Sequence, residues 1–169
     1  MLSGALELSR RQFQLFCFVA FAVAAVSNVA PPAVAQSIEA LFGSWSGHGE
    51  VVFKGASIEN IKCKAYNTSK DGELRLVIRC GSAGRRIEIR SKLKRQGVKL
   101  AGHWVERTYN ATGEAKGSIG DGSLALAISG GGLTGEMYVT YDASAMTVSI
   151  VTKGINMQSV RITLARMTK

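Results

Sequence analysis

Apolar and polar residues alternate with a period of two along most of the chain. The alternating segments are separated by Gly or Asp residues. Alternation of this kind is typical of strands that bury one face, so the pattern predicts antiparallel β-structure after a short helical segment over 37–42. We expect eight to ten strands, chosen from 45–53, 58–69, 73–80, 85–94, 98–109, 114–119, 123–129, 134–141, 145–152 and 157–166.

The first 35 residues follow a different pattern. Arg10 and Arg11 precede an apolar run over 13–29, and the small residues Ala33 and Ala35 end the segment. A basic start, an apolar run and an A-x-A ending are the features of a secretory signal peptide, with a membrane anchor as the alternative. We therefore expect cleavage after Ala35 and a periplasmic or secreted chain over 36–169, without a transmembrane segment after cleavage.

A tight turn in the predicted sheet brings two cysteines together. The dipeptide Asp71-Gly72 suits a two-residue type I′ turn, which places Lys70 opposite Glu73 and Cys63 opposite Cys80. This is a non-hydrogen-bonded position, where Cα atoms approach to about 4.5 Å. An even pair of cysteines in an exported chain also favours a bridge. The sequence therefore predicts a Cys63–Cys80 disulfide.

The next two turns are expected to continue the sheet without changing its faces. Ser82-Ala83 would pair Cys80 with Arg85, and Gln96-Gly97 would pair Arg95 with Val98. In this register the inner face carries Ile87, Ile89 and Leu93, which meet Trp104 and Leu100, and Ser91, which meets Gly102.

Each predicted strand has one apolar face, and this face of the sheet must be shielded from water. The simplest cover is closure of the sheet on itself, which predicts an all-β fold: a single antiparallel up-and-down barrel over 36–169. The outward residues include many Lys and Arg residues. Because an outer-membrane barrel needs an apolar outer band, we expect a soluble barrel with an apolar interior.

The start of the first strand carries a family resemblance. Gly43-Ser44-Trp45 resembles the Gly-x-Trp signature of lipocalin-type (calycin) barrels. The resemblance implies that Trp45 plugs the closed end and that a late arginine, Arg161 or Arg166, packs over it. Gly102-His103-Trp104 repeats the tripeptide and makes Trp104 a second plug candidate. As a whole the chain also resembles small uncharacterised exported proteins of alphaproteobacteria, which implies location and architecture but no activity.

Positive charge is concentrated in one part of the chain. The full chain has a net charge of +9, and residues 75–99 contain nine basic residues and one acidic residue. Like charges directly opposite each other destabilise a sheet by some tenths of a kcal/mol, so the concentration indicates either a solvated face or a docking surface. In the predicted register one outer row contains Lys64, Arg79, Arg86 and Arg107, and the next contains Thr68, Arg75, Arg90 and His103.

Three functions remain open at this stage. The first is a non-catalytic binding module whose basic outer face docks an anionic envelope polymer or lipid, or an acidic protein. The second is a carrier of a small apolar ligand inside the barrel, which the small inward residues Ala65, Ser91 and Gly102 favour. The third is an inhibitor of an exported or host hydrolase, acting through a loop at 130–132 or 153–156. The residues expected to bind polyanions are Lys64, Arg75, Arg79, Arg86, Arg90 and Arg107.

Catalytic and cofactor motifs are missing from the sequence. It contains no HExxH, Walker or GxSxG motif, and its two histidines, His48 and His103, have no assigned metal-binding or catalytic partner. We therefore expect no enzyme activity, metal or cofactor. Nucleic acid is not expected as a partner, because of the export signal and the few aromatic residues on the basic face.

Overall fold

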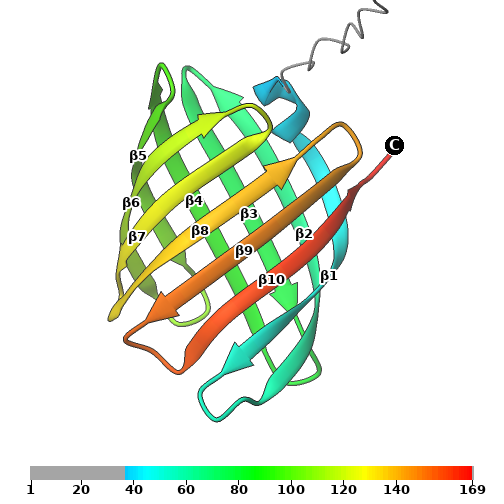
Figure 1. Ribbon diagram of the computed structural model, residues 1–169, viewed down its shortest axis with the longest axis vertical. Coiled ribbons are helices and arrows are strands. Elements are labelled where there is room, and N and C mark those ends of the chain that lie inside the picture. Colours follow the sequence, from blue (N-terminus) through cyan, green and yellow to red (C-terminus); the bar gives the residue numbers. More distant parts are fainter. Residues whose placement is uncertain (1–36, 169) are drawn as a thin grey trace, which may run out of the picture. The chain divides into compact units, whose positions relative to one another are not determined.

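The sequence folds into a closed barrel of ten strands that follow one another up and down (Figure 1). The computed structural model describes residues 37–168, so the predicted signal peptide lies outside the described residues. A single turn of 3-10 helix, η1 (Ile38–Leu41), precedes the strands. The strands are β1 (Gly43–Phe53), β2 (Ile58–Lys70), β3 (Glu73–Gly81), β4 (Arg86–Gln96), β5 (Lys99–Glu106), β6 (Ala111–Gly120), β7 (Ser123–Gly130), β8 (Leu133–Tyr141), β9 (Ala145–Lys153) and β10 (Met157–Arg166).

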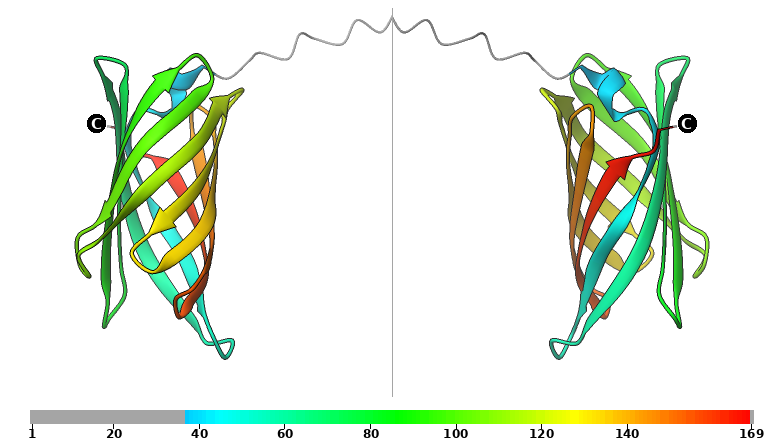
Figure 2. Two further views of the ribbon diagram at one scale, coloured as in Figure 1. Left: turned by 90° about the vertical axis from the view of Figure 1, so that its left-hand side faces the viewer. Right: turned by 90° about the vertical axis from the view of Figure 1, so that its right-hand side faces the viewer.

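Closure of the barrel is completed by its first and last strands. β1 pairs antiparallel with β10 on one side and with β2 on the other, from Trp45 opposite Arg166 to Phe53 opposite Met157. The two side views in Figure 2 show the ribbon running around the barrel. Closure removes free sheet edges, which are otherwise sites of aggregation. The predicted fold class, an antiparallel up-and-down barrel, is therefore confirmed.

The end of the barrel next to η1 has a solid interior. Side chains alternate between the interior and the outer wall along each strand, as predicted. The largest fully buried side chains near this end come from η1 and from six strands, so large residues fill it. They are Leu41, Trp45, Leu74, Leu93, Leu124, Met146 and Leu164.

The first predicted register is confirmed. Lys70 lies opposite Glu73, and Cys63 lies opposite Cys80 with a Cα–Cα distance of 4.1 Å across their disulfide. Asp71 and Gly72 both have positive φ angles, 52° and 75°, as a type I′ turn requires.

The next two predicted registers are each wrong by two residues. Cys80 pairs with Ile87 and not with Arg85, because the loop is four residues long and is closed by a hydrogen bond from the Ser82 N–H to the Arg85 carbonyl at 3.0 Å. Arg95 pairs with Leu100 and not with Val98, because Gly97 and Val98 form the turn. A shift of two residues keeps each side chain on its face but changes its neighbours.

The corrected register changes what meets inside the barrel. Ser91 lies opposite Trp104, and Leu93 lies opposite Gly102. Ile89 lies opposite Glu106, which turns a carboxylate towards the interior. The position of this carboxylate is important for the candidate site.

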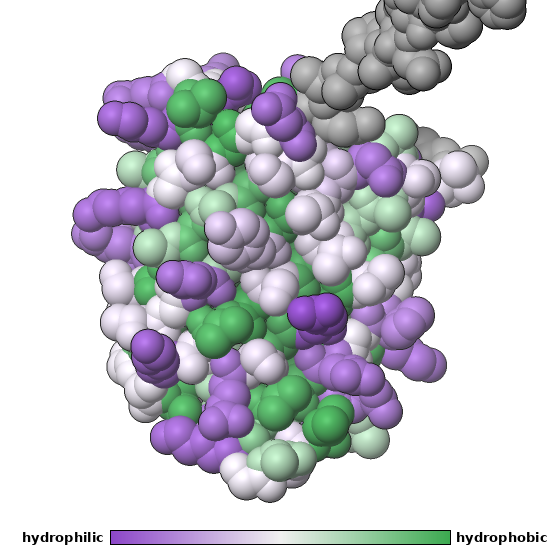
Figure 3. Space-filling model, in the orientation of Figure 1, coloured by the Kyte–Doolittle hydropathy of each residue, from purple (hydrophilic) through white to green (hydrophobic). Residues whose placement is uncertain are grey.

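The outer wall differs from one side of the barrel to the other. Basic side chains cover β2 to β4, whereas the outward residues of β7 to β9 are mostly Ser, Thr and Ala around the exposed Tyr138. Figure 3 shows many white and green residues over β8 to β10. Within residues 37–168, no helix is long and apolar enough to cross a bilayer.

Candidate functional site

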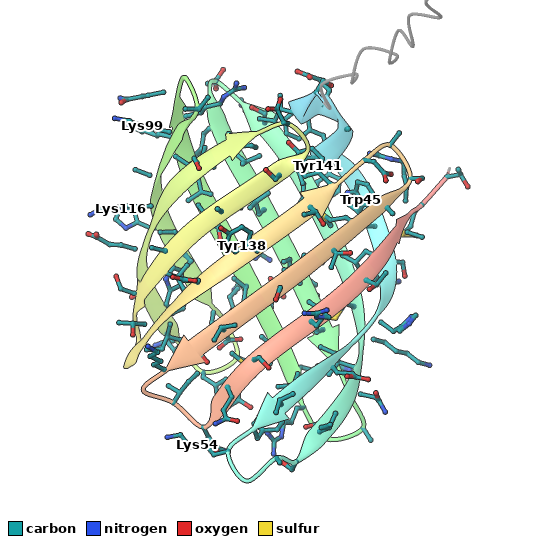
Figure 4. All side chains as sticks on the ribbon, viewed as in Figure 1. Trp45, Lys54, Lys99, Lys116, Tyr138 and Tyr141 are labelled. Carbon is teal, nitrogen blue, oxygen red and sulfur yellow. A yellow bond between two sulfur atoms is a disulfide. The ribbon has the colours of Figure 1, made fainter. Side chains whose placement is uncertain are left out.

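One end of the barrel is sealed by Trp45. Its side chain is fully buried, and its indole N–H donates a hydrogen bond to the Leu41 carbonyl at 3.1 Å. The Arg166 guanidinium lies 4.2 Å from the centre of the Trp45 ring and donates to the Phe42 carbonyl at 2.7 Å. Arg161, the other candidate for this position, is exposed on the outer wall. Figure 4 shows Trp45 near this end of the barrel.

Trp104 lies in the barrel wall near the opposite end and not in the plug. Its indole N–H faces the Ser129 carbonyl at 3.3 Å. Its ring lies against the backbone of Gly113, where an added Cβ atom would come within 2.6 Å of two ring atoms. The glycine therefore gives the ring the space to lie flat along the wall.

A cavity of about 440 Å³ opens at the end of the barrel opposite the plug. We call this end the mouth. The cavity walls are almost entirely apolar, as expected for a small-molecule site. Inner wall residues include Ile87, Ile89, Trp104, Leu126, Ile128 and Met137, and rim residues include Phe53, Arg85, Tyr109, Leu133, Ile155 and Met157.

The most unusual residue in the cavity wall is Glu106. Its side chain is only 8% exposed, and its carboxylate accepts backbone N–H hydrogen bonds from Glu88 at 3.1 Å, Thr108 at 2.9 Å and Tyr109 at 2.6 Å. Burial alone would raise the pKa of Glu106, but these hydrogen bonds outweigh it and lower the pKa. Glu106 is therefore a fixed negative charge at neutral pH.

Two further polar side chains of the cavity, Thr152 and Arg85, also have partners within the protein. The Thr152 hydroxyl donates to the Met157 carbonyl. Arg85 lies at the rim, with its guanidinium 4.5 Å from the centre of the Phe53 ring and its Nε atom 3.5 Å from a Glu59 oxygen. Since most of the lining residues are aliphatic or aromatic, the surface offered to a ligand is mainly apolar.

Five of the residues predicted to bind polyanions lie on outward-facing strand positions, whereas Arg107 lies in the loop at 107–110, after the end of β5, and so does not continue the predicted row. None of the six is among the described residues that line the cavity. The predicted row is interrupted by an acidic residue. Arg79 lies opposite Glu88, not Arg86, and its Nε atom is 3.0 Å from the Glu88 carboxylate. Arg90 contacts the same carboxylate at 2.5 Å. Hydrogen bonds from Arg79 and Arg90 lower the pKa of Glu88, so the centre of the basic wall is partly neutralised.

The second predicted row also has different neighbours. Arg75 lies opposite Lys92 and pairs with Glu73 at 2.8 Å. His103 lies opposite Lys92, not Arg90. The neighbour of His103 on its other side is Glu114.

No metal-binding cluster forms in the described part of the chain. Groups of three or more His, Cys, Asp or Glu side chains are absent from residues 37–168. His48 and His103 are both exposed on the outer wall.

Sequence reasoning missed three polar residues of the cavity, Arg85, Glu106 and Thr152. A signal for Glu106 was present, because the inward positions Leu100, Gly102 and Trp104 continue to residue 106 with the same period of two. Arg85 could not be placed without the length of its loop.

Comparisons with known proteins support the fold alone. No family model and no curated protein match the sequence. Rv2717c from M. tuberculosis has a structure similar to this chain, with a TM-score of 0.67 and 13% sequence identity, covering 82% of this chain and 99% of that protein.

Two further solved structures have the same architecture. The S-type phycobiliprotein lyase CPES from Guillardia theta matches with a TM-score of 0.56 and 13% identity over 78% of this chain and 90% of the lyase. A protein of unknown function from the DUF3598 family of Nostoc punctiforme matches with a TM-score of 0.55 and 14% identity. That match covers 79% of this chain and 50% of the DUF3598 protein, so this chain spans about half the length of that neighbour.

Proposed function

We propose that this protein is a non-catalytic binding module that holds a small, largely apolar molecule inside the barrel. The main support is the apolar cavity of about 440 Å³, which is open at one end and sealed at the other. Protein interiors are normally packed without voids of this size, because unfilled apolar space loses dispersion contacts. This observation favours the carrier hypothesis over docking through the basic wall.

The cavity also restricts the chemistry of the ligand. Apolar walls favour a hydrophobic body, at about 25 cal/mol for each Å² of apolar surface removed from water. The ionised Glu106 disfavours an anionic group beside it, because two negative charges repel strongly away from water. We therefore expect an uncharged or hydrogen-bond-donating group near Glu106.

Binding without catalysis is proposed because of how Glu106 is engaged. Both of its oxygens accept backbone N–H hydrogen bonds, which stabilise the ionised form and oppose proton transfer. The similarity to a phycobiliprotein lyase is a similarity of fold, and a shared fold does not transfer an activity.

The proposal can be tested by filling the cavity. Ala115 faces the cavity from β6, opposite Ile128 on β7, and Ala127, the residue before Ile128, is exposed on the outer wall. We expect wild-type protein to bind the uncharged fluorescent probe N-phenylnaphthylamine. Ala115→Phe should weaken this binding about tenfold or more because it occupies the cavity, whereas Ala127→Phe should leave it unchanged.

Folding of each variant is checked by thermal unfolding. If Ala115→Phe does not fold, Ser91→Leu fills the cavity from β4 instead. Equal probe binding by the filled variants and wild type would contradict the proposal. If the filled variants do lose probe binding, mass spectrometry of molecules that co-purify with wild-type protein would identify the class of the natural ligand.

A further inference from the structure

The two ends of the barrel carry opposite charge. The mouth consists of the loops at 54–57, 82–85, 107–110, 131–132 and 154–156, together with one strand residue on each side of every loop. This region contains five basic residues and one acidic residue, the buried Glu106. Glu59, next to Ile58, adds a second carboxylate that contacts Ser82 and Arg85 in the loop at 82–85, so the net charge of the mouth is +3. The basic residues are Lys54, Arg85, Arg86, Arg107 and Lys153.

The closed end has the opposite balance. It consists of residues 37–42 and 166–168 and the turns at 71–72, 97–98, 121–122 and 142–144, counted with the same flanking residues. It contains three basic and five acidic residues. Arg95, one residue further along β4, donates a hydrogen bond from its side chain to the Gly97 carbonyl in the turn at 97–98 and adds a fourth positive charge, so the net charge of the closed end is −1. The other basic residues are Lys70, Lys99 and Arg166, and the acidic residues are Glu39, Asp71, Glu73, Asp121 and Asp142. Figure 4 shows Lys54 and Lys99 at opposite ends of the barrel.

Turn geometry alone does not require this separation. Asp71 and Asp121 have φ angles of 52° and 45°, a left-handed conformation that Asp and Asn both tolerate. At the mouth, Asn110 has the same conformation, with φ of 55°, and it carries an amide instead of a carboxylate. The loops at the mouth, 54–57, 82–85, 107–110, 131–132 and 154–156, contain no acidic residue.

Exposed apolar side chains accompany the basic residues at the mouth. Ile58, at the start of β2, is 64% exposed, and Tyr109, at the rim of the cavity, is 67% exposed. Basic and apolar residues on one protruding surface are typical of proteins that bind an anionic membrane surface, where the cations attract the headgroups and the apolar side chains enter the interface.

We propose that the mouth docks onto an anionic lipid bilayer and exchanges the cavity ligand with it. This inference rests on the proposed function, because docking would provide the path by which the apolar ligand enters and leaves the cavity. An apolar ligand is poorly soluble in water, and docking of the open end lets it pass between the bilayer and the cavity without crossing the solvent. The negative closed end is repelled by the same surface, so the charge separation orients the barrel.

The test is sedimentation of the full chain with vesicles that contain phosphatidylglycerol, compared with vesicles of phosphatidylcholine alone. The mouth variant is Lys54→Glu/Arg107→Glu. The matched closed-end variant is Lys70→Glu/Lys99→Glu, and the wall variant is Lys64→Glu/Lys92→Glu. None of the six substituted side chains is among the described residues that line the cavity. Every variant contains residues 1–36, so any contribution of these residues to vesicle binding is the same in all of them.

We expect wild type to bind the phosphatidylglycerol vesicles and the mouth variant to bind about tenfold or more weakly, because each basic residue contributes to attraction at the surface. The closed-end and wall variants should bind about as well as wild type. Equal binding by the mouth variant and wild type, or a loss in the wall variant as large as in the mouth variant, would overturn the inference. A larger loss in the wall variant would instead indicate the basic outer wall as the anion-binding surface.

A second comparison tests the apolar contribution. Ile58→Ser at the mouth is matched by Val98→Ser in a closed-end turn, where Val98 is 61% exposed. In high salt, which screens the charges, Ile58→Ser should weaken vesicle binding several-fold and Val98→Ser should not. Equal effects of these two substitutions would argue against docking through the mouth.

Probe binding in the absence of vesicles separates this inference from the proposed function. The mouth variant should bind N-phenylnaphthylamine in solution as wild type does. Vesicle docking by a protein whose cavity binds no probe would reject the proposed function and with it the exchange of a ligand, while the docking surface would stand. Probe binding without vesicle docking would reject this inference alone.

Discussion

At the scale of single residues, Arg166 connects separate segments at the closed end. Its guanidinium lies over the Trp45 ring and donates hydrogen bonds to Phe42 in the first segment and to Ala143 in the loop between β8 and β9. Hydrogen bonds from a charged donor are stronger than neutral ones. One side chain therefore fastens the plug to both sides of the barrel end.

Replacement of Arg166 should destabilise the fold. Arg166→Met removes the stacking on Trp45 and leaves carbonyl groups without their donors, which should lower the free energy of unfolding by about 3 kcal/mol. Arg161→Met, on the exposed face of the same strand, should change it by less than about 0.5 kcal/mol. Urea unfolding measures both values, and equal losses in the two variants would contradict the role assigned to Arg166.

Glu106 stabilises the mouth by joining β4 to the loop between β5 and β6. Its carboxylate accepts hydrogen bonds from Glu88 on one side and from Thr108 and Tyr109 on the other. Its pKa is lowered in the folded protein, so the ionised form contributes stability above the unfolded-state pKa of about 4.3. This contribution is lost as the pH falls below that value and through the lower pKa of the folded state.

We therefore expect the loss of stability caused by Glu106→Gln to depend on pH. At pH 7 it should lower the free energy of unfolding by about 1 to 3 kcal/mol, because an amide replaces a charged acceptor. The difference from wild type should shrink as the pH falls below about 4.3, because the unfolded wild-type chain takes up the proton there, whereas the folded carboxylate, whose pKa is lowered, stays ionised to lower pH. Denaturation at both pH values measures this, with Glu136→Gln on the outer wall as the control. A difference that stays constant with pH would contradict the assignment.

At the scale of strands and turns, the sequence predicted which residues form strands better than which residues pair across neighbouring strands. Strand positions followed from the alternation, because burial of one face is a local property. The hairpin around Asp71 was predicted in register, because Asp-Gly specifies a two-residue turn. The loop from Ser82 to Arg85 has no such signal, and Gly97 suits more than one turn position, so both registers were wrong by two residues.

The disulfide belongs to the one hairpin whose register was predicted correctly. Replacement of Cys63 and Cys80 by Ala should lower the free energy of unfolding by about 2 to 5 kcal/mol, because the bridge restricts the unfolded chain across a separation of 17 residues. Denaturation with and without a reductant measures the effect, and the reductant should not affect the double variant. If wild-type protein labels with a thiol reagent after unfolding without reductant, the bridge is absent.

At the scale of the whole molecule, side-chain size decides which part of the barrel is solid and which is hollow. Large residues such as Trp45 and Leu41 fill the closed end, whereas Ser91, Ala111 and Ala115 line the cavity. The small inward residues in the sequence indicated that space could remain inside the barrel. The sequence could not predict the cavity itself, because the interior volume depends on strand number and stagger together.

The way the barrel closes has a consequence for the speed of folding. Nine of the ten strand pairs join strands that follow one another in the chain, so they can form as successive hairpins. The tenth pair, between β1 and β10, joins residues from opposite ends of the described sequence, such as Trp45 and Arg166. Its formation therefore has the largest entropic cost of loop closure. Formation of this last pair is therefore the step that we expect to set the folding rate, and the stacking of Arg166 on Trp45 can form only when it is complete.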